Sequence, residues 1–313
     1  MFVKQCKIVN IQAGQAVPGD RVEGDAMGMG TDGDTPAELA LRRRWYLEEL
    51  EVAGGWSSAD LTRAFARVPR EDFLPPGPWT IEALGGDYYP TPDASIRHIL
   101  HAVGICLDIK RNLNSGNPAL VGRSLALADV RPGETVFHVG SGFGYFTAVL
   151  AELAGPKGRV IAAEIDPDLR AAAARNLSRY PHVTVVGDAL TEDLPPVDVV
   201  FSSAGLATVP RRWVDALRPG GRMLLPLTGS LDGGYVFRFR RTADPSRFDA
   251  DRITVTRYFP CAGTRAPADM SALDLALCDR RIDLASRLSL RLDPHDKDEL
   301  CWLHAADYCL RLE

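Results

Sequence analysis

The segment from residue 135 to residue 164 constrains the fold of this chain more than any other. An apolar run over residues 136–139 leads into the glycine-rich sequence Gly140-Ser141-Gly142-Phe143-Gly144. Apolar residues then recur at helical spacing over residues 145–153, and a second apolar run follows over residues 160–163. This order predicts a strand, a tight glycine turn, a helix and a second strand, an arrangement typical of nucleotide-binding α/β folds.

The glycines of this turn indicate a ligand site, because a side chain at Gly140 or Gly142 would hold a ligand away from the backbone amides at the helix start. Glu164 stands twenty positions after Gly144, at the end of the second strand, where a nucleoside ribose would find an acceptor. The spacing departs from a dinucleotide loop, because Tyr145 occupies the place of the last glycine. An ordinary strand–helix turn is the alternative to a ligand site.

Strands and helices alternate through the rest of the middle of the chain. Strand-like runs cover residues 183–186, 197–202 and 223–227, and Asp166-Pro167 has the composition of a helix start. Beyond them, residues 235–240 and 253–259 alternate with period two, which predicts antiparallel edge strands, and a helical tail follows. The expected fold class is α/β: a Rossmann-like, doubly wound, mostly parallel seven-stranded sheet with helices on both faces, an N-terminal helical segment and a C-terminal α+β extension.

Composition limits the class of protein. The 313 residues are 46% hydrophobic, which is enough for one large core, and the net charge is −5 with arginines spread along the chain. These features argue against a nucleic-acid partner. Neither a membrane-spanning stretch nor a signal-peptide core is evident, so a cytoplasmic location is expected. The six cysteines form no C-x-x-C pair, so neither a zinc knuckle nor a disulfide framework is expected.

Two motifs together resemble one known family. After a predicted pair of N-terminal helices, residues 68–75 read V-P-R-E-D-F-L-P, and residues 139–151 read V-G-S-G-F-G-Y-F-T-A-V-L-A. The protein-L-isoaspartate O-methyltransferase family, a branch of the class I S-adenosylmethionine-dependent methyltransferases, reads V-P-R-x-x-F-V-P and G-x-G-x-G-Y-x-A-x-L-A at the same points. The resemblance runs from about Arg43 to about Pro226. It implies S-adenosyl-L-methionine as cofactor and S-adenosyl-L-homocysteine as product.

The resemblance also implies the cofactor-binding residues. The glycine loop would cradle the cofactor, Glu164 would hold its ribose, the aspartate of a G-D pair would lie by the adenine amino group, and the fourth strand would end beside the transferred methyl group. The implied residues are His138, Gly140, Ser141, Gly142, Gly144, Tyr145, Glu164, Ile165, Gly187, Asp188, Ala189 and Ser203.

Four regions are expected along the chain on this basis. Residues 1–36 would form a flexible or lid-like arm, and residues 37–118 a helical, acceptor-side segment with an insertion over residues 92–112. Residues 119–230 would form the S-adenosylmethionine-binding core. Residues 231–313 would carry the antiparallel strands and a helical C-terminal cap.

The acceptor side departs from the family pattern. The family carries T-x-S-x-P ahead of the first strand, and its threonine and serine touch the acceptor carboxyl. With Pro118 at the proline, Asn114 stands at the threonine position and Gly116 at the serine position, and Ser115 substitutes only if the loop shifts by one residue. Asn114, Ser115 and Asn117 are the candidate donors for an acceptor. His138 stands where the family usually has an acidic residue, so the cofactor is expected to be held differently.

His98 and His101 lie in the insertion ahead of this segment. The neighbouring apolar residues suit a helix, and a spacing of three would place both imidazoles on one helix face. Acid–base or acceptor-orienting chemistry is one interpretation, and packing beneath the pocket is another. Zinc would need further ligands, which the surrounding sequence does not supply, so no metal is expected.

Three functions remain open from the sequence. The first is methylation of an aspartyl or isoaspartyl carboxylate of a peptide or protein, which needs no base because a carboxylate is already a nucleophile at neutral pH. The second is C- or N-methylation of a small peptide-derived or aromatic natural product, with His98 or His101 as base. The third is a non-catalytic, cofactor-binding regulator. The expected partner is a peptide or small-molecule acceptor, without nucleic acid or membrane, and a homodimer is left open.

Overall fold

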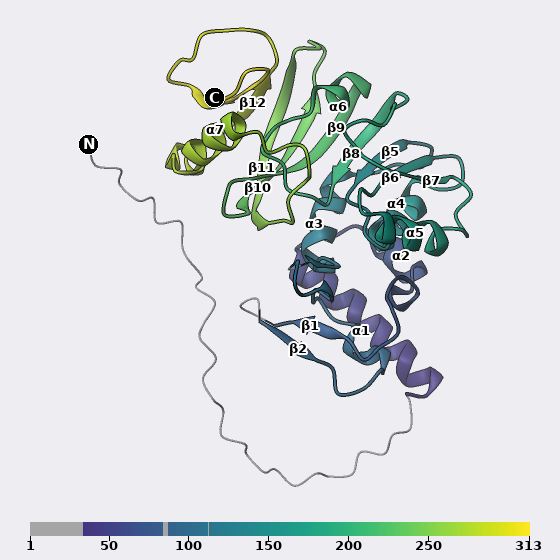
Figure 1. Cartoon of the computed structure of the whole chain (residues 1–313). Coiled ribbons are helices and arrows are strands. Elements are labelled where there is room, and N and C mark those ends of the chain that lie inside the picture. Colours follow the sequence, from purple (N-terminus) through teal and green to yellow (C-terminus); the bar gives the residue numbers. More distant parts are fainter. Residues whose placement is uncertain (1–33, 84–86, 112) are drawn as a thin grey trace, which may run out of the picture.

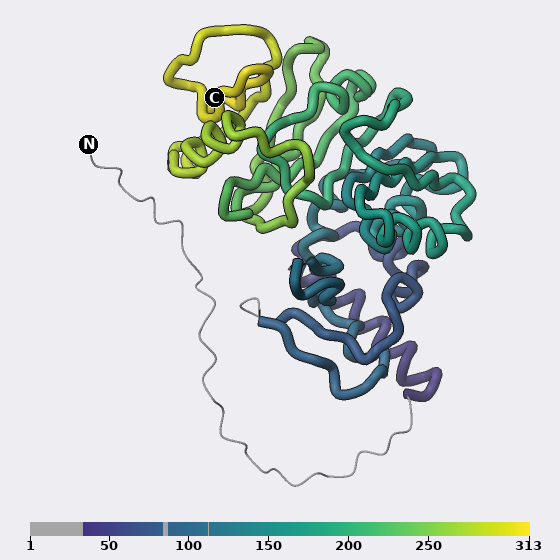
Figure 2. The backbone as a smooth tube through the Cα atoms, in the orientation of Figure 1, coloured from purple at the N-terminus to yellow at the C-terminus, as the bar shows by residue number. Residues whose placement is uncertain are grey.

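The computed structural model describes residues 34–83, 87–111 and 113–313, so the expected N-terminal arm lies, up to residue 33, outside the described residues. In Figure 1 the purple and blue N-terminal helices and hairpins pack beside a teal α/β core. The core continues into green and yellow strands near the C-terminus. The tube in Figure 2 follows the same path from the N-terminal region through the core to the extension.

One sheet of ten strands runs through the core and the extension, in the order β13-β14-β12-β11-β10-β9-β8-β5-β6-β7. The five strands from β7 to β9 pair in parallel, and the pairings from β9 to β13 are antiparallel. The strands are β5 (Thr135–Val139), β6 (Arg159–Ala163), β7 (Val183–Val186), β8 (Val197–Ser202), β9 (Leu217–Thr228), β10 (Gly233–Arg241), β11 (Arg247–Arg257), β12 (Leu288–Arg291), β13 (Cys301–His304) and β14 (Cys309–Leu312).

Short hairpins and helices complete the fold. The hairpins pair β1 (Thr80–Glu82) with β2 (Tyr88–Pro90), and β3 (Cys106–Asp108) with β4 (Leu113–Asn114). The helices are α1 (Pro36–Gly54), α2 (Ala59–Arg67), α3 (Pro118–Ala128), α4 (Tyr145–Ala154), α5 (Pro167–Asn176), α6 (Arg211–Ala216) and α7 (Pro267–Leu277), with 3₁₀ turns at η1 (Arg70–Phe73), η2 (Ile96–His98) and η3 (Arg280–Asp283). Within the described ranges, none of these helices combines the length and apolarity that a bilayer crossing requires.

Capping residues explain where two helices begin. Thr35 and Glu38 form a capping box at the start of α1. Asp166 accepts hydrogen bonds from the amides of Asp168 and Leu169 at the start of α5, and Pro167 occupies its first turn. The start at Asp166 was expected from the sequence and is confirmed.

Apolar side chains lie on both faces of the parallel strands. Along β5, Phe137 and Val139 join a core that includes Trp213 of α6, whereas Val136 joins a second core with α4 and the N-terminal helices. Alternate residues therefore serve opposite layers, as a sheet covered on both faces requires. The first of these cores continues without a break into the C-terminal strands, through residues such as Phe237 and Leu310. The expected doubly wound α/β fold is confirmed, but the sheet has ten strands instead of the expected seven, and only five of them pair in parallel.

The C-terminal extension differs from the expectation. The strands β10 and β11 are not edge strands, because β12, β14 and β13 continue the sheet beyond them. The expected helical tail is wrong beyond residue 283: Leu288 begins β12, and Trp302 and Leu303 lie in β13. Leu273 and Leu277 of α7 and Leu288 of β12 pack on the first core, whereas Leu284 follows η3 and is 87% exposed.

Replacing Phe137 tests the core beneath the parallel strands. Its fully buried ring meets Trp213 edge-on at 5.8 Å between ring centroids. We expect Phe137→Ala to lower the free energy of unfolding by about 3 to 5 kcal/mol, because it removes a large buried ring and leaves a cavity. Urea unfolding measures the change. Val52→Ala, at a position of α1 that is 84% exposed, is the control and should stay within about 0.5 kcal/mol of the parent.

Candidate functional site

The candidate site lies at the carboxyl ends of the parallel strands. After β5 the chain adds β6 and then β7 on one side, and it returns to place β8 on the other side of β5. In open α/β sheets ligands bind where the strand order reverses in this way. The glycine loop follows β5 at this point, and Glu164 follows β6.

Backbone hydrogen bonds fix the glycine loop to the end of β6. The amides of Gly140 and Ser141 both donate to the carbonyl of Ala163, at 2.9 and 3.1 Å, and the amide of Gly144 donates to Ser141 at 2.9 Å. These amides are therefore used within the protein. The glycine pattern predicted that they would be available to a ligand, and the structure shows that they are not.

Glu164 joins the loops that follow β5 and β6. Its carboxylate accepts the amide of Gly142 at 2.8 Å and the amide of Asp166 at 3.0 Å. A carboxylate offers about four acceptor positions, so two remain for a ligand. Burial raises the pKa of Glu164, and the amide hydrogen bonds from Asp166 and Gly142 oppose that rise.

The glycines differ in what surrounds them. All three have positive φ, at +74° for Gly140, +55° for Gly142 and +93° for Gly144. A Cβ at Gly144 would lie 2.9 Å from Leu177, whereas a Cβ at Gly142 would meet no described protein atom within 4 Å. The hydroxyl of Ser141 is buried and has no hydrogen-bond partner among the described residues. Open space at Gly142 and an unsatisfied hydroxyl beside it fit a ligand that approaches the loop closely.

The cofactor-binding residues expected after β6 and β7 also lie at the carboxyl ends of the parallel strands. Ile165 follows Glu164 and is 53% exposed although its side chain is apolar. Gly187 and Asp188 follow β7; Asp188 accepts the amide of Leu190 at 2.9 Å, and Ala189 is buried with its carbonyl bonded to Trp213. Together these residues form a partly apolar border beside the carboxylate of Glu164.

His138 lies beneath the loop and is fully buried. One ring nitrogen pairs with the hydroxyl of Thr147 at 2.8 Å and the other with the hydroxyl of Ser203 at 3.0 Å, so both are used within the protein. Burial lowers the pKa of His138 to about 3, and the ring is neutral near pH 7. The side chain thus holds Ser203 in place after β8.

Tyr145 belongs to the core, although the sequence suggested a ligand contact. Its ring is buried beside Phe65, Phe73 and Phe146, and its hydroxyl lies 3.2 Å from that of Tyr46. Burial raises the pKa of Tyr145 well above its ordinary value. The side chain anchors α4 against the N-terminal helices.

The acceptor segment lies next to the glycine loop. A Cβ at Gly116 would approach the ring of Phe146 in α4 to 3.2 Å, and Arg111 forms an ion pair with Asp166 at 2.7 Å. Asn117 caps α3 through the amide of Ala119. The expected donors are therefore brought to the site, although Asn117 already serves a helix.

A polar cluster forms around Asn114 in this segment. Its side-chain amide donates to Glu82 and to the hydroxyl of Tyr88, each at 3.1 Å. Burial raises the pKa of Glu82, an effect that the charge of Arg257 opposes, and burial also raises the pKa of Tyr88. Because the hydroxyl of Tyr88 accepts from Asn114, its own proton remains available for a ligand.

Arg70 organises the insertion and does not pair with the nearby Asp72. The buried guanidinium donates to the carbonyls of Ile99, His101 and Val103 at 2.7 to 2.9 Å. It also reaches the hydroxyl of Ser115 at 3.4 Å. Asp72 instead pairs with Arg179. The arginine of the V-P-R motif therefore holds the insertion against the acceptor segment.

The helix expected through His98 and His101 is wrong, because the 3₁₀ turn η2 ends at His98. His98 pairs with Asp93 at 2.8 Å, and His101 pairs with Glu49 of α1 at 3.3 Å. The two rings therefore have separate carboxylate partners. Carbonyls bonded to Arg70 shape this loop, which the spacing of apolar residues does not reveal.

A segment that the sequence analysis did not single out borders the site. Cys261 donates its amide to the carbonyl of Gly205, after β8, at 2.7 Å. Burial raises the pKa of the Cys261 thiol to about 11. A Cβ at Gly263 would lie 2.7 Å from Leu190. This segment follows β11, so only the antiparallel return of the chain brings it to the strand ends.

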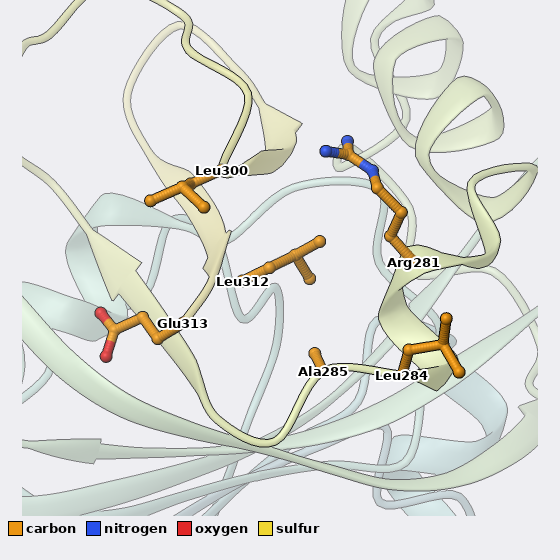
Figure 3. A pocket seen from close by; sticks show the side chains of 6 residues that line it. All are labelled: Arg281, Leu284, Ala285, Leu300, Leu312 and Glu313. Atoms are coloured by element: carbon orange, nitrogen blue, oxygen red, sulfur yellow. The ribbon is translucent and has the colours of Figure 1, made fainter.

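A separate pocket of about 280 Å³ lies in the C-terminal extension, toward the opposite end of the sheet from the glycine loop. Figure 3 shows Leu300, Leu312, Ala285 and Leu284 around it, with Arg281 and Glu313 at its border. Its lining is mainly apolar, and it lies away from the glycine loop. The candidate site is defined by the loops at the strand ends instead.

Solved structures show the fold to which this arrangement belongs. The chain superimposes on a protein-L-isoaspartate O-methyltransferase with a TM-score of 0.61 and 24% identity, over 74% of this chain and 70% of that one. A Plasmodium falciparum protein of the same description, crystallised with S-adenosyl-L-homocysteine, gives a TM-score of 0.54 and 16% identity over 70% of this chain and 97% of its own. The fold is the Rossmann-like α/β fold of the class I methyltransferases.

Sequence comparison then identifies the family. The profile of the family described as Protein-L-isoaspartate(D-aspartate) O-methyltransferase matches residues 93–266. A protein-L-isoaspartate O-methyltransferase of Aeropyrum pernix is 37% identical over 203 residues, 63% of this chain and 69% of the relative. One of Hyperthermus butylicus is 30% identical over 234 residues, 71% of this chain and 88% of the relative. The chain belongs to the protein-L-isoaspartate O-methyltransferase family, as its motifs indicated.

Burial of His138 predicts a pH dependence of stability. Above its ordinary pKa of 6.5 the ring is neutral in both the folded and the unfolded chain. Between 6.5 and about 3 the unfolded chain binds a proton that the folded chain does not, so stability falls as the pH falls. His138→Gln should remove up to about 1.4 kcal/mol per pH unit from this slope.

Urea unfolding over a pH series measures that slope. Val52→Ala, at a position of α1 that is 84% exposed, is the control, because it removes no titratable group and its slope should equal that of the parent. Equal slopes for His138→Gln and the parent would contradict a neutral, buried ring.

Proposed function

We propose that this chain is an S-adenosylmethionine-dependent methyltransferase that esterifies an aspartyl or isoaspartyl carboxylate of a peptide or protein. Membership of the family supports the reaction class, and the names of the relatives supply the acceptor. Cys106, Cys261, Cys301 and Cys309 are not part of a disulfide, which fits a cytoplasmic location.

One observation supports this cofactor over a dinucleotide. Dinucleotide loops bind a pyrophosphate through free backbone amides, but four amides of this loop already donate within the protein. The loop therefore provides space at Gly142 and an acceptor at Glu164, while these four amides are not available to a phosphate. S-adenosylmethionine carries a ribose with two hydroxyls and no phosphate. Glu164 would hold the ribose, and Ile165 and Asp188 would border the adenine.

When bound, the cofactor supplies a methyl group activated by a positively charged sulfur. A carboxylate acceptor needs no general base, so this chain's own residues must orient the acceptor and exclude water. Tyr88 is the proposed donor to one acceptor oxygen, because Asn114 fixes its hydroxyl and leaves its proton free. Ser115 and Asn117 would contribute by holding the acceptor loop in position, together with Arg70.

One observation favours the second candidate function, methyl transfer to nitrogen or carbon. His98 lies 2.8 Å from Asp93, the arrangement in which a carboxylate orients an imidazole to act as a base. Alkaline treatment of the methylated product separates the two functions. A methyl ester releases methanol, whereas an N- or C-methyl product retains its methyl group.

Glu164 is the residue whose replacement tests the cofactor site. Glu164→Ala should weaken binding of S-adenosyl-L-homocysteine by about 1.5 to 3 kcal/mol, because it removes the charged acceptor for the ribose hydroxyls. Glu164→Gln, which keeps one carbonyl oxygen, should lose less. Isothermal titration calorimetry measures both affinities. Asp168→Asn, at an exposed position in the first turn of α5, is the control, and parent-like affinity for Glu164→Ala would exclude Glu164 from the site.

Tyr88 tests the acceptor side independently. Tyr88→Phe should lower kcat/KM for an isoaspartyl peptide roughly 10-fold, since it removes one hydrogen bond to a charged oxygen. Affinity for S-adenosyl-L-homocysteine should stay unchanged. Tyr89→Phe is the matched control, because the neighbouring Tyr89 is 48% exposed. If both variants retain parent kcat/KM, Tyr88 does not orient the acceptor.

A further inference from the structure

Four potential metal ligands converge in the C-terminal extension, toward the other end of the sheet from the candidate methyltransferase site. One ligand atom from each of His295, Cys301, His304 and Cys309 lies within 4.8 Å of the other three. Both cysteines are buried and both histidines are half-buried. Neither cysteine is part of a disulfide.

The strand register explains why these residues meet. In the antiparallel pair of β13 and β14, His304 lies directly opposite Cys309. The register shifts between Cys301 and Leu303, which inserts one extra residue into β13. Residues three apart in a regular strand face opposite sides, but this extra residue brings Cys301 to the side of His304. Leu303 and Leu310 face the apolar core instead.

The loop after β12 brings the fourth ligand. β12 ends at Arg291, which pairs with Cys309 of β14, so the following loop passes beside the cluster. His295 lies in that loop, with its Nε2 atom 3.6 Å from the sulfur of Cys301. Its Nδ1 atom lies 2.9 Å from the carbonyl of Asp293. A carbonyl accepts and does not donate, so Nδ1 carries the proton and Nε2 presents its lone pair to the cluster. Metal-binding histidines are usually oriented by a hydrogen bond of this kind.

An unsatisfied atom points independently to a ligand. The Nδ1 atom of His304 is buried and has no hydrogen-bond partner among the described residues. Burial of a polar atom without a partner costs free energy, which a metal bond would offset. The ring of His304 lies 5.1 Å from that of His295, at an interplanar angle of 86°.

Donors also surround the sulfur of Cys301. The amide of Asp298 lies 3.4 Å from this sulfur, and a guanidinium nitrogen of Arg311 lies 3.5 Å from it. The carboxylate of Asp298 also lies 3.3 Å from this sulfur, so groups outside the cluster hold Cys301 in place, as the outer hydrogen-bond partners of metal ligands do. Arg311 is itself fixed by an ion pair with Asp298 at 2.9 Å.

We infer that His295, Cys301, His304 and Cys309 bind one zinc ion, which joins the loop after β12 to β13 and β14. Zinc takes four ligands in a tetrahedron, and two thiolates with two imidazoles form one of its usual structural sets. Tetrahedral zinc with ordinary bond lengths separates its sulfur ligands by about 3.8 Å and its nitrogen ligands by about 3.3 Å, so the ligand atoms need to close by about 1.5 Å at most. Binding releases the two thiol protons to solvent.

The surroundings of the cluster allow an ion to enter. A pocket of about 460 Å³ is lined by both histidines, with Arg211 and Tyr308 among its other residues. Four protein ligands leave no open position for a substrate, so the ion stabilises the extension and takes no part in methyl transfer. The zinc site is thus independent of the proposed function.

Metal content and cobalt substitution test the site on the full chain. The protein, purified under reducing conditions and reconstituted with zinc, should contain one zinc per chain by elemental analysis. Cobalt should give a thiolate charge-transfer band and the intense visible bands of tetrahedral coordination. His295→Ala, which changes a loop residue outside the strand ladder, should weaken cobalt binding at least roughly 100-fold. Cys309→Ser should abolish the charge transfer from its sulfur.

Cys278→Ser is the matched control, because Cys278 is exposed and lies outside the cluster, and it should retain full zinc content. A chelator should lower the melting temperature of the parent and leave that of His295→Ala unchanged. The proposal is overturned if the reduced parent binds no zinc, if His295→Ala binds cobalt as tightly as the parent, or if Cys301 and Cys309 form a disulfide in the reduced preparation.

Discussion

The shape of the glycine loop depends on the hydrogen bonds it makes to the end of β6. The carbonyl of Ala163 accepts two amides of the loop, and the carboxylate of the next residue, Glu164, accepts a third. Because β5 and β6 are parallel neighbours, these bonds set where α4 begins relative to the sheet. The positive φ angles at Gly140 and Gly142 follow from this attachment. Glu164 therefore shapes the loop and also presents an acceptor beside it.

The N-terminal region and the insertion act as one unit on the acceptor side. Arg70 donates to three carbonyls of the insertion, and Asn114 links both short hairpins through Glu82 and Tyr88. The carbonyls of a loop of this kind need hydrogen-bond donors, and one guanidinium group supplies several. The family's threonine and serine positions have changed in this chain, while the arginine of the V-P-R motif remains. The residue that holds the acceptor side in place thus matches the family pattern, whereas the residues expected to contact the acceptor differ from it.

Local sequence patterns predicted the core correctly because the interactions behind them join residues that are close in sequence. Three features depend on neighbours in sequence: residues 136–139 alternate between two apolar layers, Asp166 caps a helix, and glycines form the turn after β5. The failures have a long-range cause. The histidines at 98 and 101 have helical spacing, but hydrogen bonds from Arg70 to the carbonyls of this segment hold it in another conformation. The spacing of Cys301 and His304 indicates a shared site only when the register shift in β13 and the partner strand β14 are known. A search for C-x-x-C pairs misses a C-x-x-H pair completed by residues on two other segments.

The order of strands in the extension also constrains how it assembles. β14 lies between β12 and β13, although both precede it in the chain. Residues of β13 therefore leave the ribosome before the strand that must pair with them, and the pairing edge of β12 is unoccupied during the same interval. Unpaired edges attract other strands. The sheet of the extension therefore closes only when β14 inserts between two strands that precede it in the chain.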